Sequence, residues 1–214
     1  MSNDPIQKAL EILEESFNLS APKAFLNSIK EYEDLVSTWN DYASLISPKD
    51  LDRAFSDHVA DSLSLVPYIH SLAKKGYVYL DVGTGGGFPA IPVKLFAPHI
   101  ESSLIERKTR KASFLLKAIS HLNLLNIHVL DQSFPSSMPL QQPFVLTARA
   151  IEKPSIFLHD TAKILKHPSV FLRQSGHSPP ALPAPLEQTP VDDVFDHAKL
   201  RRGRLYKVTS KTAS

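Results

Sequence analysis

Four of the seven glycines in this 214-residue chain lie within five positions, and the first of them stands two positions after an acidic residue. The pattern is Asp81-x-Gly83-x-Gly85-x-Gly87, and it follows the β-branched and aromatic run 77–80. Glycine weakens the interior of helices and strands, so this cluster indicates a loop with unusual φ angles or close approach to a ligand. The apolar segment that follows begins at Pro89, which suits the first turn of a helix. A strand, a glycine turn and a helix form half of a doubly wound nucleotide site.

The spacing of these residues separates two classes of nucleotide site. A dinucleotide fingerprint reads G-x-G-x-x-G, with its acidic residue about 20 positions later. Here Asp81 precedes the glycines and the third glycine comes one position early, so an NAD-dependent oxidoreductase is least favoured. The order resembles the first motif of class I S-adenosylmethionine methyltransferases, which have an α/β, Rossmann-like doubly wound sheet. A tight turn without a ligand is the structural alternative.

Three further strand ends carry side chains that could meet a ligand, because ligands of doubly wound sheets bind across the carboxyl ends of the strands. Glu106 ends the run 103–106, and its carboxylate could accept both ribose hydroxyls or, alternatively, cap a surface turn. Phe134 and Pro135 follow the third predicted strand, where they could meet an adenine or cover the core. Arg149 follows the fourth strand. It could hold the donor's carboxylate, hold O6 and N7 of a guanine, or lie in solvent.

Helical periodicity fills the first third of the chain. Apolar residues recur every three or four positions over 6–17 and 25–39, and Ser20 is a plausible N-cap of the second helix. A third helix is predicted from the capping box at 47–50 to a stop near Pro67. No glycine and no strand pattern interrupts this part.

Strands alternate with helices after Gly76. The predicted strands are 77–82, 101–106, 127–130, 144–147, 169–172 and 205–209, the predicted helices are 89–96, 109–122 and 155–166, and the proline-rich segment 175–190 is expected to be a loop. Such alternation implies a parallel sheet with right-handed crossovers. We therefore divide the chain into a helical N-terminal region, residues 1–75, and a Rossmann-like methyltransferase domain, residues 76–214.

Composition excludes several classes of protein. A hydrophobic content of 43% supports a real core, and a net charge of +2 fits local contact with RNA rather than a general nucleic-acid coat. The chain has no cysteine, which excludes disulfides, thiolate metal sites and the cysteine nucleophile of cytosine-C5 methyltransferases. It begins without a signal peptide, has no apolar run of about 18 residues, and shows no ordered histidine spacing. We therefore expect a cytoplasmic protein with no membrane span and no metal site.

The remaining chemistry is attack by an atom that already carries a free lone pair, such as N7 of guanine. The Asn/Asp-Pro-Pro-aromatic motif of adenine amino-group methyltransferases is absent. Transfer to N7 needs no general base, because the rate gain comes from holding sulfonium, methyl and nucleophile in line. No residue is therefore assigned a catalytic role in proton transfer.

Several motifs resemble those of the bacterial glucose-inhibited division protein B family, the guanine-N7 methyltransferases of small-subunit (16S) ribosomal RNA. The matching segments are Asp81 to Pro92, Trp39-Asn40, His58 to Leu63, Glu106 with Lys111 and Phe114-Leu115, Leu122 to Ile127, and Arg149-Ala150. They extend over about residues 35–176. The sequence departs from the family's pattern at Ser44, Asp57, Pro135 and Ser175.

The resemblance implies S-adenosylmethionine as cofactor and methylation of a guanine N7 in 16S ribosomal RNA or the small ribosomal subunit. Together with the strand ends, it gives this cofactor-binding set: Asp81, Gly83, Gly85, Phe88, Glu106, Phe134, Pro135 and Arg149. Lys108, Arg110, Lys111 and the cluster 199–204 are candidate phosphate contacts, with solvated charge as the alternative. We expect a monomer. A methyltransferase with a non-rRNA acceptor and a non-catalytic nucleotide-binding paralogue are the competing functions.

Overall fold

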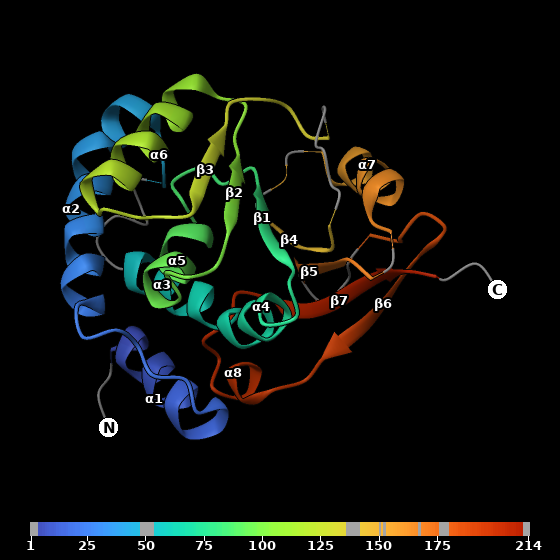
Figure 1. Cartoon of the computed structure of the whole chain (residues 1–214), viewed down its shortest axis with the longest axis horizontal. Coiled ribbons are helices and arrows are strands. Elements are labelled where there is room, and N and C mark those ends of the chain that lie inside the picture. The colour runs from blue at the N-terminus through green and yellow to red at the C-terminus, as the bar shows by residue number, and fades with distance from the viewer. Residues whose placement is uncertain are drawn as a thin grey trace.

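The structure is a computed structural model of the chain. It describes residues 4–47, 54–135, 142–149, 151, 153–166, 168–175 and 180–211. A twisted central sheet separates a large group of helices on one face from a single helix, α7 (Pro154–Ile164), on the other (Figure 1).

Among the described residues, four helices precede the first strand: α1 (Pro5–Phe17), α2 (Phe25–Ala43), α3 (Ala54–Leu63) and α4 (Val66–Ala73). Asp4 caps α1, because its Oδ1 accepts a hydrogen bond from the Ile6 amide at 3.0 Å. The predicted cap at Ser20 is wrong, since α2 begins at Phe25 without a side-chain cap.

The predicted third helix is only partly right. Its proposed capping box reaches into residues 48–50, which lie outside the described residues. Pro67 does not stop this helix but sits in the first turn of the separate helix α4. Proline is tolerated there because the first amide groups of a helix have no intrahelical partner.

The sheet has seven strands in the order β3-β2-β1-β4-β5-β7-β6. Their bounds are β1 (Val78–Val82), β2 (Ser102–Ile105), β3 (Ile127–Leu130), β4 (Phe144–Ala148), β5 (Val170–Ser175), β6 (Leu186–Val191) and β7 (Arg204–Ser210). Strands β1 to β5 are parallel, and β1 is the middle one of these five, as in a doubly wound fold. The remaining helices are α5 (Ala90–Phe96), α6 (Thr109–His121) and α8 (Val194–His197).

The C-terminal edge of the sheet corrects two predictions. Strand β7 pairs antiparallel with both β5 and β6, so the sheet is mixed rather than wholly parallel. The segment 175–190 is not loop throughout, because most of β6 lies within it. Pro190 is accommodated there because β6 is an edge strand, where a missing amide donor breaks no ladder.

The alternation of side chains along β1 divides the core in two. Tyr79 belongs to the larger cluster, which unites α1 to α6 with one face of the sheet. Leu80 points to the other face and joins Phe157 and Leu158 of α7. The N-terminal helices thus share one continuous core with the sheet. The division at residue 75 stays a prediction.

No helix in the described ranges is both long and apolar enough to cross a membrane. Each helix instead buries one face against the sheet or against a neighbouring helix. For α2, that face consists of Phe25, Ile29, Tyr32, Leu35, Val36, Asn40 and Ala43.

A buried carboxyl group lies between β1 and β4. Asp81 is 1% exposed and pairs in register with Thr147, whose hydroxyl donates to Asp81 Oδ1 at 2.6 Å. Tyr79 lies on the same face of β1, and its hydroxyl is 2.8 Å from Thr147 Oγ1. Burial raises the pKa of Asp81 to about 7, even though the Thr147 hydrogen bond opposes the rise.

The raised pKa predicts how stability depends on pH. The native protein keeps the Asp81 proton up to about pH 7, whereas the unfolded chain loses it near the ordinary pKa of 3.8. The native state therefore binds more protons in this window, and the free energy of unfolding falls as pH rises across it. Asp81→Asn should remove this slope. The free energy of unfolding of Asp81→Asn minus that of wild type should therefore increase by about 1–4 kcal/mol as the pH rises from 5 to 8.

Urea unfolding at pH 5, 6, 7 and 8 measures this difference. Asp61, whose pKa burial also raises, contributes the same sign of slope in both proteins and cancels in the comparison. Parallel curves for the two proteins would contradict the assignment to Asp81.

Candidate active site

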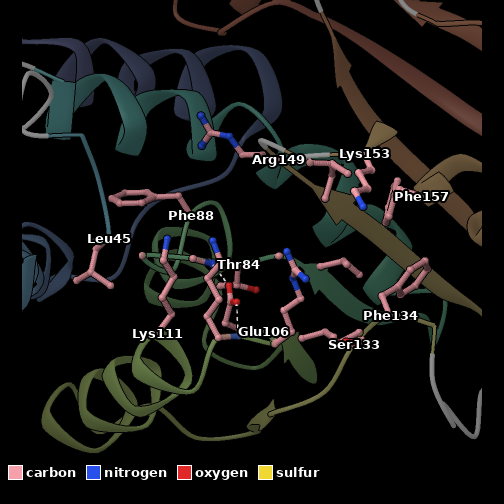
Figure 2. Close-up of a pocket in the computed structure, with 18 of the residues that line it drawn as sticks. Leu45, Thr84, Phe88, Glu106, Lys111, Ser133, Phe134, Arg149, Lys153 and Phe157 are labelled. Carbon is pink, nitrogen blue, oxygen red and sulfur yellow. Dashed lines mark hydrogen bonds between the residues drawn. The ribbon is translucent and has the colours of Figure 1, made fainter. Parts of the chain in front are cut away.

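A cavity of about 720 Å³ opens at the carboxyl ends of β1, β2 and β4 (Figure 2). This is the edge of a doubly wound sheet where ligands bind, and the volume lies within the usual range of about 300–1,000 Å³ for small-molecule sites. Six of the eight predicted cofactor-binding residues line it: Gly83, Gly85, Phe88, Glu106, Phe134 and Arg149. Asp81 and Pro135 are not among the lining residues.

The glycine loop between β1 and α5 forms one wall. Gly83, Gly85 and Gly87 have φ angles of 68°, 58° and 95°, which L-residues rarely adopt. A Cβ atom at Gly87 would lie 2.5 Å from Ile91 Cδ1 and 2.8 Å from the Tyr32 hydroxyl. Close packing of the loop against α2 and α5 therefore requires glycine at this position.

Glu106 joins the loop to the end of β2. Its Oε2 accepts from the Gly85 amide at 3.0 Å, and its Oε1 accepts from the Lys108 amide at 2.8 Å. Glu106 is only 5% exposed, so the turn that follows it is not an exposed one, but its bond to the amide of Lys108, the N-cap of α6, is the capping contact of the alternative interpretation. A carboxylate has about four lone-pair sites, so two acceptor positions remain for hydroxyl groups of a ligand.

The predicted aromatic residues stand on opposite sides of the cavity. Phe134 packs on Phe157 of α7, with ring centroids 5.1 Å apart, and lines one wall. Phe88 is 7% exposed and its ring lies 5.0 Å from that of His58 on α3. Figure 2 shows Phe88 across the cavity from Phe134.

Arg149 is held by residues from the N-terminal helices. Its Nη2 lies 2.6 Å from Asp61 Oδ2 in an ion pair and 3.4 Å from His58 Nδ1. Its side chain is 15% exposed, so the reading as a solvent-exposed arginine is wrong. Arg149 Nη1 is buried and has no hydrogen-bond partner within the part of the chain that the structure describes.

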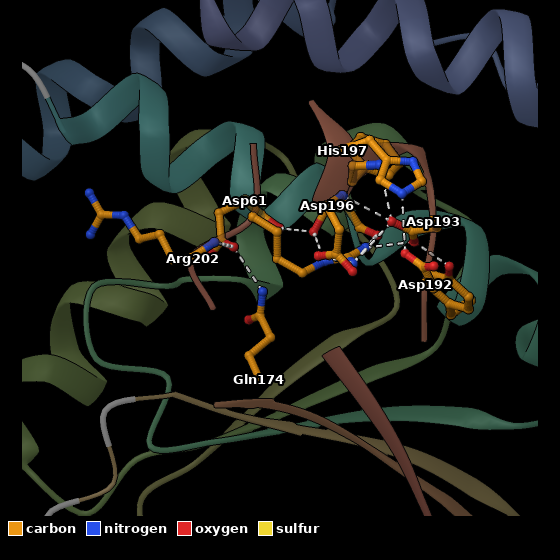
Figure 3. A network of polar contacts seen from close by, with 11 residues as sticks. Asp61, Gln174, Asp192, Asp193, Asp196, His197 and Arg202 are labelled. Atoms are coloured by element: carbon orange, nitrogen blue, oxygen red, sulfur yellow. Dashed lines mark hydrogen bonds and ion pairs between the residues drawn. The ribbon is translucent and has the colours of Figure 1, made fainter. Parts of the chain in front are cut away.

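Asp61 connects three segments that are far apart in the sequence. Besides Arg149, its Oδ1 accepts from Gln174 Nε2 of β5 at 2.8 Å and from the backbone amide of Arg202 at 2.7 Å (Figure 3). The Asp61 side chain is fully buried, and loss of this carboxylate would leave several donors unsatisfied. The family resemblance included Asp61, but no local pattern predicted these contacts.

The basic cluster at 199–204 divides into two roles. The side chain of Arg201 is fully buried, with Nη2 2.8 Å from Asp193 Oδ2 and Nη1 3.0 Å from Asp196 Oδ1. Its prediction as a phosphate contact is therefore wrong. Its Nε also donates to Ser64 Oγ at 3.1 Å, which fixes the C-terminal segment against the junction of α3 and α4.

Arg202, the next residue, lines the cavity, and its Nη1 lies 3.2 Å from His58 Nε2. No feature of the sequence distinguishes Arg202 from the buried Arg201. The lining holds six cationic side chains against the two acidic ones of Glu106 and Asp160, and we call Lys108, Lys111, Lys153 and Arg202 the positive rim.

The described residues contain no group of three or more histidine or acidic side chains placed to hold a metal ion. Asp81 is buried in β1, two residues before the first glycine of the loop. Its Oδ2 is buried and has no hydrogen-bond partner among the described residues. A buried polar atom without a partner is rare in a folded protein, so Asp81 Oδ2 is a candidate contact for a polar group of a ligand.

Solved structures share this architecture. The chain superposes on a mutant of MtNAS in complex with S-adenosylmethionine with a TM-score of 0.60 at 14% identity, covering 97% of this chain and 84% of that one. Another MtNAS mutant structure gives a TM-score of 0.57. At this level of identity, the likeness establishes the fold alone, and this is the doubly wound α/β fold that the sequence predicts.

Sequence relatives are more specific. The proteins named ribosomal RNA small subunit methyltransferase G from Coxiella burnetii and Chromobacterium violaceum are 28% and 30% identical to this chain, over 77% and 81% of its length and 78% and 77% of theirs. The protein of that name from Neisseria gonorrhoeae is 32% identical over 69% of each chain. The family described as rRNA small subunit methyltransferase G matches residues 25–181, which include the glycine loop, Glu106 and Arg149. The chain belongs to this methyltransferase family.

Proposed function

We propose that this protein transfers the methyl group of S-adenosylmethionine to N7 of a guanine in small-subunit ribosomal RNA. The observation that carries the proposal is the open cavity between the glycine loop and Glu106, in a chain that belongs to this family. A tight turn without a ligand would be expected to pack against neighbouring side chains and leave no cavity of this size.

The residues around the cavity suit the donor. Glu106 has acceptor positions left for the two ribose hydroxyls, and Phe134 offers an apolar wall for the adenine. Asp81 does not line the cavity, so we propose that its unpartnered Oδ2 meets the donor's ammonium group through a water, with the carboxyl group in its ionised form. When bound, the donor supplies an electrophilic methyl group on a sulfonium.

The chain's own part in the reaction is positioning. N7 of guanine carries a free lone pair, so no side chain has to remove a proton before transfer. The loop and Glu106 hold one reactant while the rim orients the other, and such alignment supplies the rate gain. Arg149, fixed by Asp61, lies on the wall between the glycine loop and the rim, and we propose that it contacts the donor.

The positive rim suits an RNA substrate. Lys108, Lys111, Lys153 and Arg202 line the cavity, and cationic side chains contribute most of the sequence-independent affinity for phosphates. N7 is hidden in the deep major groove of A-form RNA, so the target guanine must be unpaired or exposed in a partly assembled particle. We propose that the protein acts as a monomer, because one chain supplies the whole cavity. We place it in the cytoplasm, where small subunits assemble.

Mass spectrometry of ribosomal RNA nucleosides tests this function. Small-subunit RNA from cells lacking the protein should lose one 7-methylguanosine, and complementation should restore it. Large-subunit RNA from the same cells is the control. An unchanged 7-methylguanosine content would reject the proposed acceptor, and methylation of a free metabolite by the purified protein would favour the non-rRNA alternative.

Removing the charge of Glu106 tests the ribose contact. Glu106→Gln should weaken S-adenosylhomocysteine binding about 10- to 100-fold, because charge-assisted hydrogen bonds contribute about 1.5–3 kcal/mol each. Calorimetry measures the dissociation constant. Asp131→Asn is the matched control, since Asp131 is an exposed acid after β3 outside the cavity. Equal affinity of the two variants, with unchanged melting temperatures, would exclude Glu106 from the donor site.

A further inference from the structure

A second cavity of about 370 Å³ lies between α2 and α6, outside the donor site. Thr38, Trp39, Tyr42 and Ser113 line it, and we call it the aromatic notch. Trp39 and Tyr42 form an edge-to-face pair with ring centroids 5.9 Å apart. Trp39 is anchored from beneath by the buried Phe114, whose centroid is 6.1 Å away. The notch is therefore an aromatic surface that is packed against the core on one side and open to solvent on the other.

The notch also carries a positive charge. The guanidinium of Arg110 lies 5.0 Å from the centroid of the Tyr42 ring, within the range of a cation–π contact. Tyr42 nevertheless keeps 56% of its surface exposed. Flat aromatic faces beside arginine are the means by which proteins hold unpaired bases, because every base has a π-face and is linked to a phosphate.

The notch is next to the donor cavity along both of its elements. After α2 ends, Leu45 lines the donor cavity only three residues beyond Tyr42. In the first turn of α6, Arg110 stacks on Tyr42 while its neighbour Lys111 lines the donor cavity. Three residues of chain span at most about 10 Å, so the two cavities are within reach of consecutive nucleotides.

We infer that the aromatic notch binds a nucleobase close to the target guanine in the same unpaired strand. The inference rests on the proposed function and adds how the substrate is recognised. A base stacked on Tyr42 places its phosphate beside Arg110, and the strand then continues over Lys111 to the donor cavity. The charge beside the rings favours RNA over an apolar protein segment as the occupant.

Substitution of Tyr42 tests this role. Tyr42→Ala should raise the KM for small ribosomal subunits about 5- to 100-fold, as expected for loss of one stacked base. The kcat and the affinity for S-adenosylhomocysteine should stay near wild type, because Tyr42 does not line the donor cavity. Tyr42→Phe keeps the ring and should restore the KM. Leu125→Ala, which truncates an apolar side chain that is 73% exposed elsewhere, is the surface control.

The tryptophan provides a second readout that needs no methyl transfer. Trp39 is the only tryptophan in the chain, so its fluorescence reports on the notch alone. Titration with a single-stranded adenylate hexamer should quench it in wild type and in Tyr42→Phe, and much less in Tyr42→Ala. If the hexamer does not quench Trp39 in wild type, the notch does not bind a nucleobase and the inference is overturned. This holds even if Tyr42→Ala raises the KM for small subunits, because that pair of results would point to a ribosomal protein as the occupant.

The two proposals fail separately. If wild type methylates small subunits and Tyr42→Ala has an unchanged KM, the notch has no role in recognition while the proposed function stands. If wild type methylates no ribosomal RNA but the hexamer still quenches Trp39 through Tyr42, the base-binding notch stands and the proposed acceptor is rejected.

Discussion

The hydrogen bond from the Gly85 amide to Glu106 Oε2, 3.0 Å long, is the contact on which the site depends. It ties the loop after the central strand β1 to the end of its neighbour β2, and so fixes the width of the gap between them. Positive φ angles, which only glycine adopts without strain, allow the loop amides to face this gap. The parallel sheet provides the two adjacent strand ends, and the core beneath keeps them in register.

A second constraint comes from the buried carboxylate of Asp61. It binds Arg149 from the sheet and the backbone of Arg202 from the C-terminal segment, while α3 itself belongs to the N-terminal helices. Removing one partner of a buried ion pair leaves an uncompensated charge, which strongly destabilises a protein. The helical region is therefore part of the site rather than an appendage. Through Asp61, this region places Arg149 on the wall of the cavity and Arg202 on its rim.

Local patterns in the sequence were enough for most of the sheet and for the glycine loop. The strand 127–130 and the loop after Asp81 follow from β-branched runs and glycine spacing, and the structure has them there. Contacts between distant segments left no such pattern. Arg201 and Arg202 are indistinguishable as neighbours in the sequence, yet one is buried in ion pairs and the other lines the cavity. Strand β6 was missed because Pro190 reads as a loop residue until the edge of the sheet is known.

The central claim is that the cavity between the loop and Glu106 takes the donor, and a crystal structure with S-adenosylhomocysteine tests it most directly. We expect the ribose hydroxyls within hydrogen-bond distance of Glu106, with the adenine beside Phe134. A complex in which the ligand lies elsewhere and this cavity is empty, or failure to bind at millimolar ligand, would contradict it.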